Sequence, residues 1–368
     1  MKVLVTGANG FIGKNLCTKL GEMSNLEVLA ITRESSLADI QTAAAQADFV
    51  FHLAGVNRPQ NVEDFQVGNA LSTQTLCHAL SQTQRQIPLV YTSSIQAAQD
   101  HPYGRSKLAA EEIILAYAKT SSANTFIYRL PNVFGKWCKP NYNSAVATFC
   151  HNIARDLPIS INEPSATLSL VYIDDVINTF IDLLAQPKSF GGYQEIEPVY
   201  PTTVGAVVES IRSFKDSRDT LITDRVGTGF LRALYSTYVS YLPTNSFSYK
   251  VPKHGDARGV FVEMLKTPDS GQFSFFTAHP GITRGDHYHH TKTEKFLVIK
   301  GKAHFGFRNI ATDEIYELTT TGDEPEIVET VPGWTHNITN IGDEEMIVML
   351  WANEIFDRSK PDTIAQKV

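Results

Sequence analysis

A glycine-rich stretch, TGANGFIG at residues 6–13, constrains the fold of this chain more than any other feature. It follows an apolar run at residues 3–5 and leads into Leu16 and Leu20, which are spaced like one face of a helix. The pattern therefore predicts a strand, a tight turn and a helix. Such a turn lets the backbone approach a pyrophosphate at the helix N-terminus. The glycines that would allow this approach are Gly7, Gly10 and Gly13.

Strand-like and helix-like segments alternate through about residue 185. Apolar strands are expected at residues 3–5, 26–32, 48–53, 89–92 and 125–130, with helices at 69–80 and 106–119 among the segments between them. This alternation predicts an α/β fold of the Rossmann type, a doubly wound parallel sheet with helices on both faces. Ligands in that architecture bind beyond the carboxyl ends of the strands.

Two strand ends add to the expected dinucleotide site. Arg33 follows the second strand, about 20 residues beyond the glycine-rich turn, where an NAD-selective site carries Asp or Glu. Arginine can pair with a 2′-phosphate, so the sequence favours NADPH as the cofactor. The alternative is that Arg33 is a solvated surface charge. The third strand closes with HLAG, in which Leu53, Ala54 and Gly55 offer a surface for ribose or adenine. A plain buried strand end is the alternative there.

A serine, a tyrosine and a lysine follow the fourth strand. Ser94 comes at the strand end, and Tyr103 and Lys107 lie at i and i+4, on one face of a helix. A fixed ammonium nearby lowers the pKa of a tyrosine, which is about 10 in isolation. Lys107 can also hold the nicotinamide ribose while Ser94 binds the substrate oxygen. We therefore expect these three to be catalytic in interconverting a carbonyl and an alcohol.

Together these motifs resemble the extended short-chain dehydrogenase/reductase family, which works largely on nucleotide sugars. The resemblance covers residues 1 to about 240 and includes HLAG at 52–55, Asn69, TSS at 92–94, YGRSK at 103–107, RLPNVFG at 129–135 and VYIDDV at 171–176. It implies pyrophosphate contacts from Asn9 and from the backbone N–H groups of Phe11 and Ile12, and a substrate contact from Asn132.

One departure from that family narrows the chemistry. Members that dehydrate a sugar carry an Asp-Glu pair directly after the active-site serine or threonine, because eliminating water needs its own acid and base. Ile95 and Gln96 occupy those positions here. The resemblance therefore favours reduction or epimerisation over dehydration.

The sequence pattern changes from α/β to β-rich after a linker expected at residues 243–248. Before the linker, residues 203–214 are helix-like and residues 230–241 form a Tyr-rich stretch, which we interpret as a packing surface between the two domains. Beyond it, short β-rich segments alternate with Gly, Asp and Asn turns, which predicts an all-β barrel or jelly roll. The expected strands are 259–265, 272–278, 294–299, 303–307, 314–318, 326–330 and 345–351. The expected domains are 1–245 and 246–368.

The second domain contains a set of potential metal ligands. His287 and His289 alternate in extended chain and point to the same side. With Glu294 and His336 they make four N/O ligands suited to Zn or another first-row divalent metal. The spacing resembles both motifs of the cupin family, whose metal positions these residues match. The adjacent His290 fits no ligand position and is expected at the rim.

The lead-in DARGVFVE, at 256–263, also resembles metal-free deoxysugar 3,5-epimerases of the cupin family. In those enzymes the histidine at the position of His287 is the catalytic base, whereas here it is expected to bind metal. Which group removes a proton in this domain therefore stays open.

The order of the two domains, with HYHHTKTEKFLV at 287–298, resembles bifunctional enzymes of capsule and O-antigen biosynthesis in the UDP-N-acetyl-L-fucosamine pathway. The resemblance implies 3-epimerisation of UDP-2-acetamido-2,6-dideoxy-β-L-arabino-hexos-4-ulose in the cupin domain. NADPH reduction at C4 would then give UDP-2-acetamido-2,6-dideoxy-L-talose. The alternatives are a reductase whose cupin domain is a structural, ligand-binding or dimerisation module, and an oxygenase.

Composition limits the partners and the compartment. The net charge is −7, from 32 basic and 39 acidic residues without a basic run, so binding to nucleic acid or anionic membrane is not indicated. No apolar run reaches the roughly 18 residues of a membrane span, and no signal-peptide pattern precedes the first strand. The four cysteines lie singly, as reduced thiols do. We expect a cytosolic protein, and the resemblance implies a homodimer.

Overall fold

The computed structural model describes residues 1–185, 191–252, 254–256, 259–261, 265, 271–354 and 359–368. The chain divides into two compact units, each described here by itself. Unit 1 comprises Met1–Phe134, Tyr142–Ser144 and Leu168–Pro201, and unit 2 comprises Gly135–Asn141, Ala145–Thr167 and Thr202–Val368. The helices between residues 203 and 240 thus belong to unit 2, while the predicted division after residue 245 stays a prediction.

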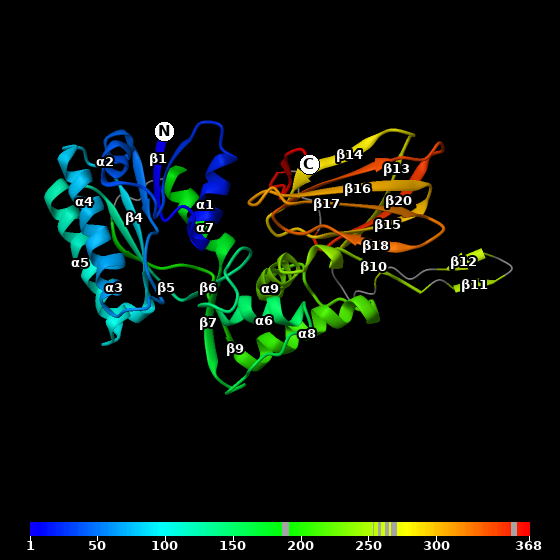
Figure 1. The fold of residues 1–368 in the computed structure, drawn as a ribbon, viewed down its shortest axis with the longest axis horizontal. Helices are drawn as coiled ribbons and strands as arrows, with labels where there is room; N and C mark the ends of the chain where they lie inside the picture. Colours follow the sequence, from blue (N-terminus) through cyan, green and yellow to red (C-terminus); the bar gives the residue numbers. More distant parts are fainter. Residues whose placement is uncertain (186–190, 253, 257–258, 262–264, 266–270, 355–358) are drawn as a thin grey trace. The chain divides into compact units, whose positions relative to one another are not determined.

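Six parallel strands form the main sheet of unit 1, in the order β2-β1-β3-β4-β5-β8 (Figure 1). They are β1 (Lys2–Thr6), β2 (Glu27–Ile31), β3 (Phe49–His52), β4 (Leu89–Ser94), β5 (Thr125–Leu130) and β8 (Gly192–Gln194). The predicted parallel α/β sheet is confirmed. Strand β2 lies on one side of β1 and β3 on the other, so the strand order reverses at β1. Ligands bind at such a reversal, beyond the strand ends.

Helices cover both faces of this sheet. On one face α2, α4 and α5 bury Ala44, Leu80 and Ile114 in a shared apolar core with the strands. On the other, α1 and α7 lie side by side, and Phe180 of α7 stacks on Phe51 of β3 (Figure 1). The helices of unit 1 are α1 (Phe11–Gly21), α2 (Leu37–Gln46), α3 (Glu63–Phe65), the π-helix η1 (Gln66–Leu71), α4 (Ser72–Gln82), the 3₁₀ helix η2 (Ile95–Ala98), α5 (Pro102–Ser121) and α7 (Ile173–Ala185). Strands β6 (Asn132–Phe134) and β7 (Thr167–Tyr172) pair in parallel beside them.

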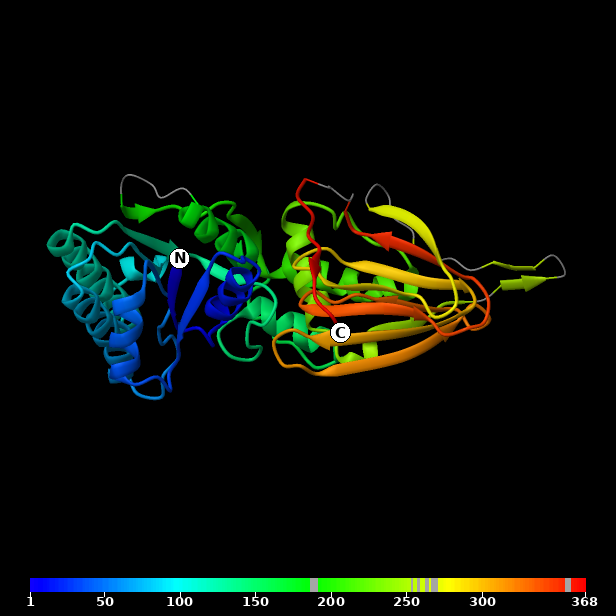
Figure 2. The ribbon, with the colours of Figure 1, turned by 90° about the horizontal axis from the view of Figure 1, so that it is seen from above.

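Two five-stranded antiparallel sheets dominate unit 2 and confirm the all-β prediction. The first has the order β10 (Ser248–Lys250), β18 (Glu326–Glu329), β15 (Glu294–Lys300), β20 (Met346–Ala352) and β13 (Gln272–Ala278). The second has the order β17 (Ile315–Thr321), β16 (Lys302–Asn309), β19 (Trp334–Asn340), β14 (Thr283–Tyr288) and β21 (Ile364–Ala365). Strand β21 lies in the red segment that ends at the label C in Figures 1 and 2.

A short hairpin of β11 (His254–Asp256) and β12 (Gly259–Phe261) lies between β10 and β13 in the chain. The strand expected at 259–265 continues past β12 into residues 262–264, which lie outside the described residues. The epimerase-like lead-in at 256–263 also falls partly outside them.

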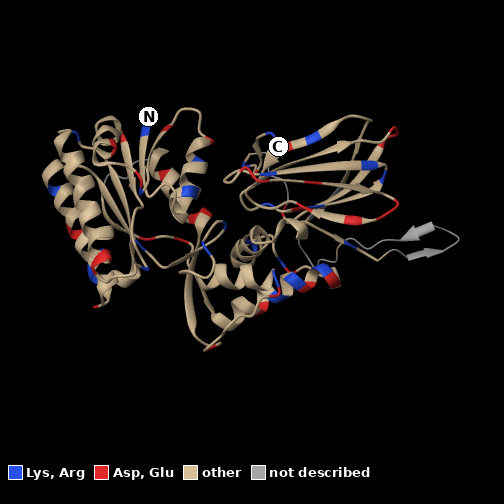
Figure 3. Cartoon of the chain, viewed as in Figure 1, with Lys and Arg blue, Asp and Glu red and all other residues tan. Residues whose placement is uncertain are grey.

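Among its described residues, unit 2 also has three α-helices, α6 (Ala145–Ile153), α8 (Val204–Thr220) and α9 (Gly229–Ser240), with a 3₁₀ turn at η3 (Thr244–Ser246). Strand β9 (Tyr200–Thr203) leads into α8. Phe214 of α8 packs on Tyr235 and Tyr238 of α9, so the Tyr-rich stretch packs inside this unit. Acidic and basic residues are interspersed along α8 (Figure 3). Within the described residues, no helix has the length and apolar character needed to cross a bilayer.

Candidate functional site

The glycine-rich turn joins β1 to α1 at the reversal of strand order. Gly7 has a φ of +66°, and a Cβ there would lie 2.7 Å from the backbone nitrogen of Ala54. A Cβ on Gly13 would lie 2.1 Å from the carbonyl oxygen of Gly7. Only glycine tolerates both positions. The turn therefore brings backbone N–H groups close to the end of β3, an arrangement that fits a pyrophosphate.

The remaining expected cofactor residues surround this turn. Gly10 caps the N-terminus of α1, which Phe11 and Ile12 begin. The exposed Asn9 lies in the turn itself, and Leu53, Ala54 and Gly55 follow β3 directly. Arg33 is exposed two residues after the end of β2, on the same edge of the sheet. Its expected role with a 2′-phosphate stays a prediction.

A buried histidine, His52, links the strand ends next to the glycine-rich turn. The His52 ring bonds to Thr6 Oγ1 through Nδ1, at 2.7 Å, and to Thr73 Oγ1 through Nε2, at 2.8 Å. Burial, together with the charge of Lys107, lowers the pKa of His52 to about 3, so the ring is neutral. His52 thus ties β1, β3 and α4 together. The sequence analysis noted His52 only as the first residue of the HLAG motif and did not predict this linking role.

The three residues expected to be catalytic lie on adjacent elements. Ser94 ends β4, and Tyr103 and Lys107 lie in the first turns of α5. Lys107 is buried, and its Nζ donates to Tyr91 Oη at 3.2 Å and to the carbonyl oxygen of Thr92 at 2.9 Å. Burial lowers the pKa of Lys107 to about 8, although the charge of Glu111 opposes this shift.

The expectation that Lys107 lowers the pKa of Tyr103 is wrong for this structure. Burial raises the pKa of Tyr103, and a hydrogen bond with Ser94 opposes the rise. The ammonium of Lys107 acts elsewhere, because it donates to Tyr91 and Thr92. Tyr103 is therefore a neutral phenol at neutral pH, ready to donate a proton.

Asn69 anchors the same region from the π-helix η1. Its Nδ2 donates to Ser106 Oγ and to the carbonyl oxygen of Val56, both at 2.9 Å, and its Oδ1 accepts from the N–H of Val56 at 2.9 Å. A Cβ on Gly55 would lie 2.9 Å from this Oδ1 and 3.3 Å from Lys107 Nζ. Single π-turns inside helices frequently mark functional sites. Here the π-turn places the side-chain amide of Asn69 between the loop after β3 and helix α5, so that it binds both.

A buried carboxylate that the sequence analysis missed supports the end of β4. Glu111 of α5 is 0 % exposed and accepts from Ser93 Oγ at 2.5 Å and from Tyr193 Oη at 2.9 Å. Arg129 of β5 binds both oxygens of Glu111, with contacts of 2.6 to 3.2 Å. Glu111 lies on α5, the helix that also carries Tyr103. It fixes Ser93, while the neighbouring Ser94 hydrogen-bonds with Tyr103.

An open cavity of about 950 Å³ lies beside the end of β4. Ile95, Arg129, Pro131 and Ser169 contribute to its wall, and all belong to unit 1. Asn132, the expected substrate contact, is exposed in β6 directly after Pro131. Its expected role, and a role for the neighbouring cavity, stay predictions.

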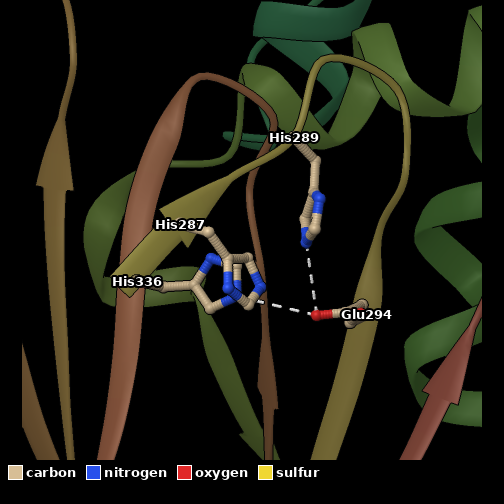
Figure 4. A group of neighbouring side chains, drawn as sticks. All are labelled: His287, His289, Glu294 and His336. Carbon is tan, nitrogen blue, oxygen red and sulfur yellow. Dashed lines mark hydrogen bonds and ion pairs between the residues drawn. The ribbon is translucent and has the colours of Figure 1, made fainter. Parts of the chain in front are cut away.

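In unit 2 the structure brings all four predicted metal ligands together. One ligand atom from each of His287, His289, Glu294 and His336 lies within 4.8 Å of all the others. Glu294 Oε2 lies 3.4 Å from His289 Nε2 and 3.6 Å from His336 Nε2 (Figure 4). The residues come from β14, the loop after it, β15 and β19. The neighbouring His290 is outside the cluster. Its ring packs against the ring of Tyr288, with 5.6 Å between the two ring centroids.

The register of two strands aligns this cluster. His287 of β14 pairs with His336 of β19, and the pairing shifts between Gly285 and His287 at a β-bulge. Bulges re-aim side chains near functional sites. A Cβ on Gly285, whose φ is +105°, would lie 2.9 Å from the carbonyl oxygen of His336. The sequence pattern predicted the ligands, but it gave no sign of the bulge.

The ionisation of the cluster suits a divalent ion. Burial, with the nearby His336 and His289, lowers the pKa of His287 to about 4, so its imidazole is neutral, as metal binding requires. Both ring nitrogens of His336 are buried without a hydrogen-bond partner among the described residues. A buried imidazole in that state fits a metal ligand, because unpaired buried polar atoms are costly. Lys292, which the sequence analysis did not single out, pairs with Glu294 Oε1 at 2.8 Å.

The fold and the two sites define a class of protein in which a dinucleotide-binding α/β unit is joined to a cupin-like β unit. Residues 3–197 match the NAD dependent epimerase/dehydratase family, and residues 254–364 match the polysaccharide biosynthesis C-terminal domain. The chain belongs to the NAD dependent epimerase/dehydratase family. Membership implies a nicotinamide dinucleotide cofactor.

The similarity to individual proteins extends over both units. The chain is 60% identical over 368 residues to the UDP-2-acetamido-2,6-beta-L-arabino-hexul-4-ose reductase of Pseudomonas aeruginosa, covering 100% of this chain and 99% of that protein. It is similar to the crystal structure of the capsular polysaccharide assembling protein CapF from Staphylococcus aureus, with 42% identity, a TM-score of 0.69 and full coverage of both chains. A Bacillus cereus UDP-glucuronic acid 4-epimerase shares the fold at 22% identity and a TM-score of 0.53, over 58% of this chain and 83% of that one.

Proposed function

We propose that this protein is a bifunctional nucleotide-sugar enzyme of capsule or O-antigen biosynthesis. Unit 2 epimerises C3 of UDP-2-acetamido-2,6-dideoxy-β-L-arabino-hexos-4-ulose. Unit 1 then reduces the C4 ketone with NADPH to give UDP-2-acetamido-2,6-dideoxy-L-talose. The observation that carries the proposal is that one chain holds both the Ser94, Tyr103 and Lys107 site and the four-ligand cluster, with 60% identity to a reductase of this type of sugar along its whole length.

When bound at the reductase site, NADPH would supply the hydride that reduces C4 of the sugar. Ser94 and Tyr103 hydrogen-bond to the ketone oxygen, and Tyr103 Oη gives it the one proton that reduction to an alcohol consumes. The raised pKa of Tyr103 favours this direction, because the phenol arrives protonated. Lys107 would hold the nicotinamide ribose and Arg33 the 2′-phosphate of NADPH, and Asn132 would contact the sugar.

In unit 2 the residues of the cluster would hold a divalent ion, for which Zn fits the three imidazoles and one carboxylate. When bound, such an ion polarises a ketone oxygen and acidifies the adjacent C–H. Epimerisation removes the C3 proton and returns a proton to the opposite face, with no change in oxidation state. His287, His289 and His336 would bind the ion through their imidazoles, and Lys292 balances the charge of Glu294.

Deuterium exchange separates the two activities. In D2O without NADPH, the wild-type protein should incorporate deuterium at C3 of the 4-ketosugar, and His287→Ala or Glu294→Ala should stop this. Tyr103→Phe should keep C3 exchange and lose about 10²- to 10⁴-fold in NADPH oxidation, the usual range for a general acid. NMR of the product sugar and metal analysis complete the experiment.

Other outcomes of the same experiment point to other functions. Continued C3 exchange in both metal-ligand variants would remove the epimerase assignment and leave a reductase whose cupin domain is structural, ligand-binding or dimerising. O2 uptake on adding the sugar would favour an oxygenase. Loss of both activities in Tyr103→Phe would mean that the two sites depend on each other.

We also propose that the protein works in the cytoplasm as a homodimer. Its four cysteines, Cys17, Cys77, Cys138 and Cys150, are free thiols, as in a reducing compartment. Two of them, Cys77 and Cys150, are buried. Sedimentation of the purified protein tests the dimer, and cell fractionation tests the compartment.

A further inference from the structure

The segment at residues 359–368 packs against the metal-ligand cluster. Its strand β21 pairs with β14, placing Ala365 opposite His287 and Ile364 opposite Tyr288. The N–H of Gln366 donates to the carbonyl oxygen of Asp286 at 2.9 Å, and its own carbonyl accepts from Thr335 Oγ1 at 2.5 Å. The segment thus borders two of the ligand-bearing strands, β14 and β19.

Asp362, just before β21, binds the loop that joins His289 to Glu294. Its carboxylate accepts hydrogen bonds from the backbone N–H groups of residues 290–292, at 2.9, 2.7 and 2.8 Å. Thr291 Oγ1 donates a further bond at 3.0 Å. Four donors therefore converge on one carboxylate, and they fix the loop between two of the four ligands.

The main-chain carbonyl of Asp362 contacts a ligand directly. It lies 2.5 Å from His289 Nδ1, which places the other ring nitrogen, Nε2, 3.4 Å from Glu294 Oε2. A histidine that binds metal usually donates its second nitrogen to a carbonyl or carboxylate, and this bond sets the tautomer and the ring orientation. The Asp362 carbonyl is placed to do this for His289.

We propose that Asp362 is a positioning residue of the metal site. Its carboxylate shapes residues 290–292, its carbonyl orients the His289 ring, and the site is therefore complete only when residues 359–368 lie against β14. The inference rests on the metal site of the proposed function. Loss of a partner of this kind usually weakens metal affinity about 10- to 100-fold.

The substitution Asp362→Asn tests this in the full chain. The amide has nearly the same shape, but its NH2 group cannot accept the N–H donors of the loop. Titration with Zn²⁺ should show about 10- to 100-fold weaker binding. Titration with Co²⁺ should show shifted visible absorption bands, because His289 no longer holds its orientation. NADPH binding to unit 1 should stay unchanged, and the fluorescence of the tryptophans, which all lie in unit 2, reports that unit 2 is folded.

The matched control is Asp313→Asn. Asp313 is an exposed carboxylate of unit 2 that pairs with Arg308, and its loss should leave both metal titrations unchanged. Wild-type Zn²⁺ affinity and a wild-type Co²⁺ spectrum in Asp362→Asn would overturn the proposal. If that variant does not fold, Asp362→Glu takes its place, with intermediate affinity expected and wild-type values again contradicting the idea. Failure of the wild-type protein to bind either ion would instead refute the metal site itself.

Discussion

Each unit supports its site with a buried carboxylate that binds the strand residue next to a site residue. In unit 1, Glu111 holds Ser93, and the next residue, Ser94, belongs to the candidate site. In unit 2, Glu329 pairs with Lys295 at 2.9 Å, and the preceding residue, Glu294, belongs to the four-ligand cluster. In both units the buried carboxylate thus fixes the strand directly beside the site.

The two carboxylates differ in what surrounds them. Arg129, the cation beside Glu111, is 34% exposed, whereas Lys295 and Arg218, the cations beside Glu329, are 1% and 14% exposed. Tyr249 Oη also accepts from Lys295 Nζ at 2.9 Å. Loss of Glu111 would leave a cation that water can reach. Loss of Glu329 would leave one that water cannot reach, so unit 2 should depend more strongly on its carboxylate.

The largest effect is expected from Glu329→Gln. It leaves the Lys295 ammonium buried without its carboxylate, which should cost about 3–5 kcal/mol in the free energy of unfolding of unit 2. All three tryptophans, Trp137, Trp334 and Trp351, belong to unit 2, so their fluorescence during chemical denaturation reports this loss.

Two further variants sharpen this comparison. Glu344→Gln breaks an exposed pair with Lys300 and should cost less than about 1 kcal/mol. Glu111→Gln, followed by hydrogen exchange in unit 1, should cost about 1–3 kcal/mol, because Arg129 reaches solvent. Equal losses in the free energy of unfolding for Glu111→Gln and Glu329→Gln would contradict the idea that unit 2 depends more strongly on its buried carboxylate.

A smaller effect is expected from Gly13→Ala. Unit 1 depends on close backbone contacts, and a Cβ at Gly13 would meet the carbonyl oxygen of Gly7 at 2.1 Å. Overpacking of this kind costs about 1–3 kcal/mol, so NADPH affinity should fall about 10- to 100-fold. The control is Gly21→Ala at the end of α1, where a Cβ would meet nothing within 4 Å. Unchanged NADPH binding by Gly13→Ala in a fluorescence titration would mean that the turn relaxes at little cost.

The smallest effect is a pH dependence of unit 1. Lys107 has a pKa lowered to about 8 by burial, so its ammonium is charged below that pH and lost above it. The kcat/KM for NADPH oxidation should therefore fall about tenfold per pH unit above 8. In Lys107→Arg this falling limb should disappear, because guanidinium does not titrate in this range. A wild-type profile that stays level to pH 9.5 would assign the ammonium no part in the reaction.

Sequence reasoning worked where the chemistry depends on local spacing. Tyr103 and Lys107 are four residues apart on one helix, and Gly7 and Gly13 belong to one turn, so their geometry follows from the elements alone. The pair His287 and His289 follows from strand alternation in the same way. Both fold classes were predicted for the same reason, because each depends on periodicities within short segments.

Contacts between distant residues left no such signal. Asp362 is 72 residues from His290, and nothing around it in the sequence marks it as a partner. Glu111 meets Tyr193 across 82 residues, and Lys295 looks like an ordinary strand residue until Glu329 is placed beside it. The pKa of Tyr103 was expected to fall because the effect of burial cannot be read from a spacing of four residues.

The Glu111 cluster and the cavity wall beside β4 should tolerate different amounts of redesign. Engineering toward another nucleotide sugar could vary Ile95 and Ser169, whose side chains border the cavity without taking part in the Glu111 cluster. Arg129 serves both the cavity wall and Glu111, so a library that randomises it would trade selectivity against expression yield. Ser93 should be kept in any such library.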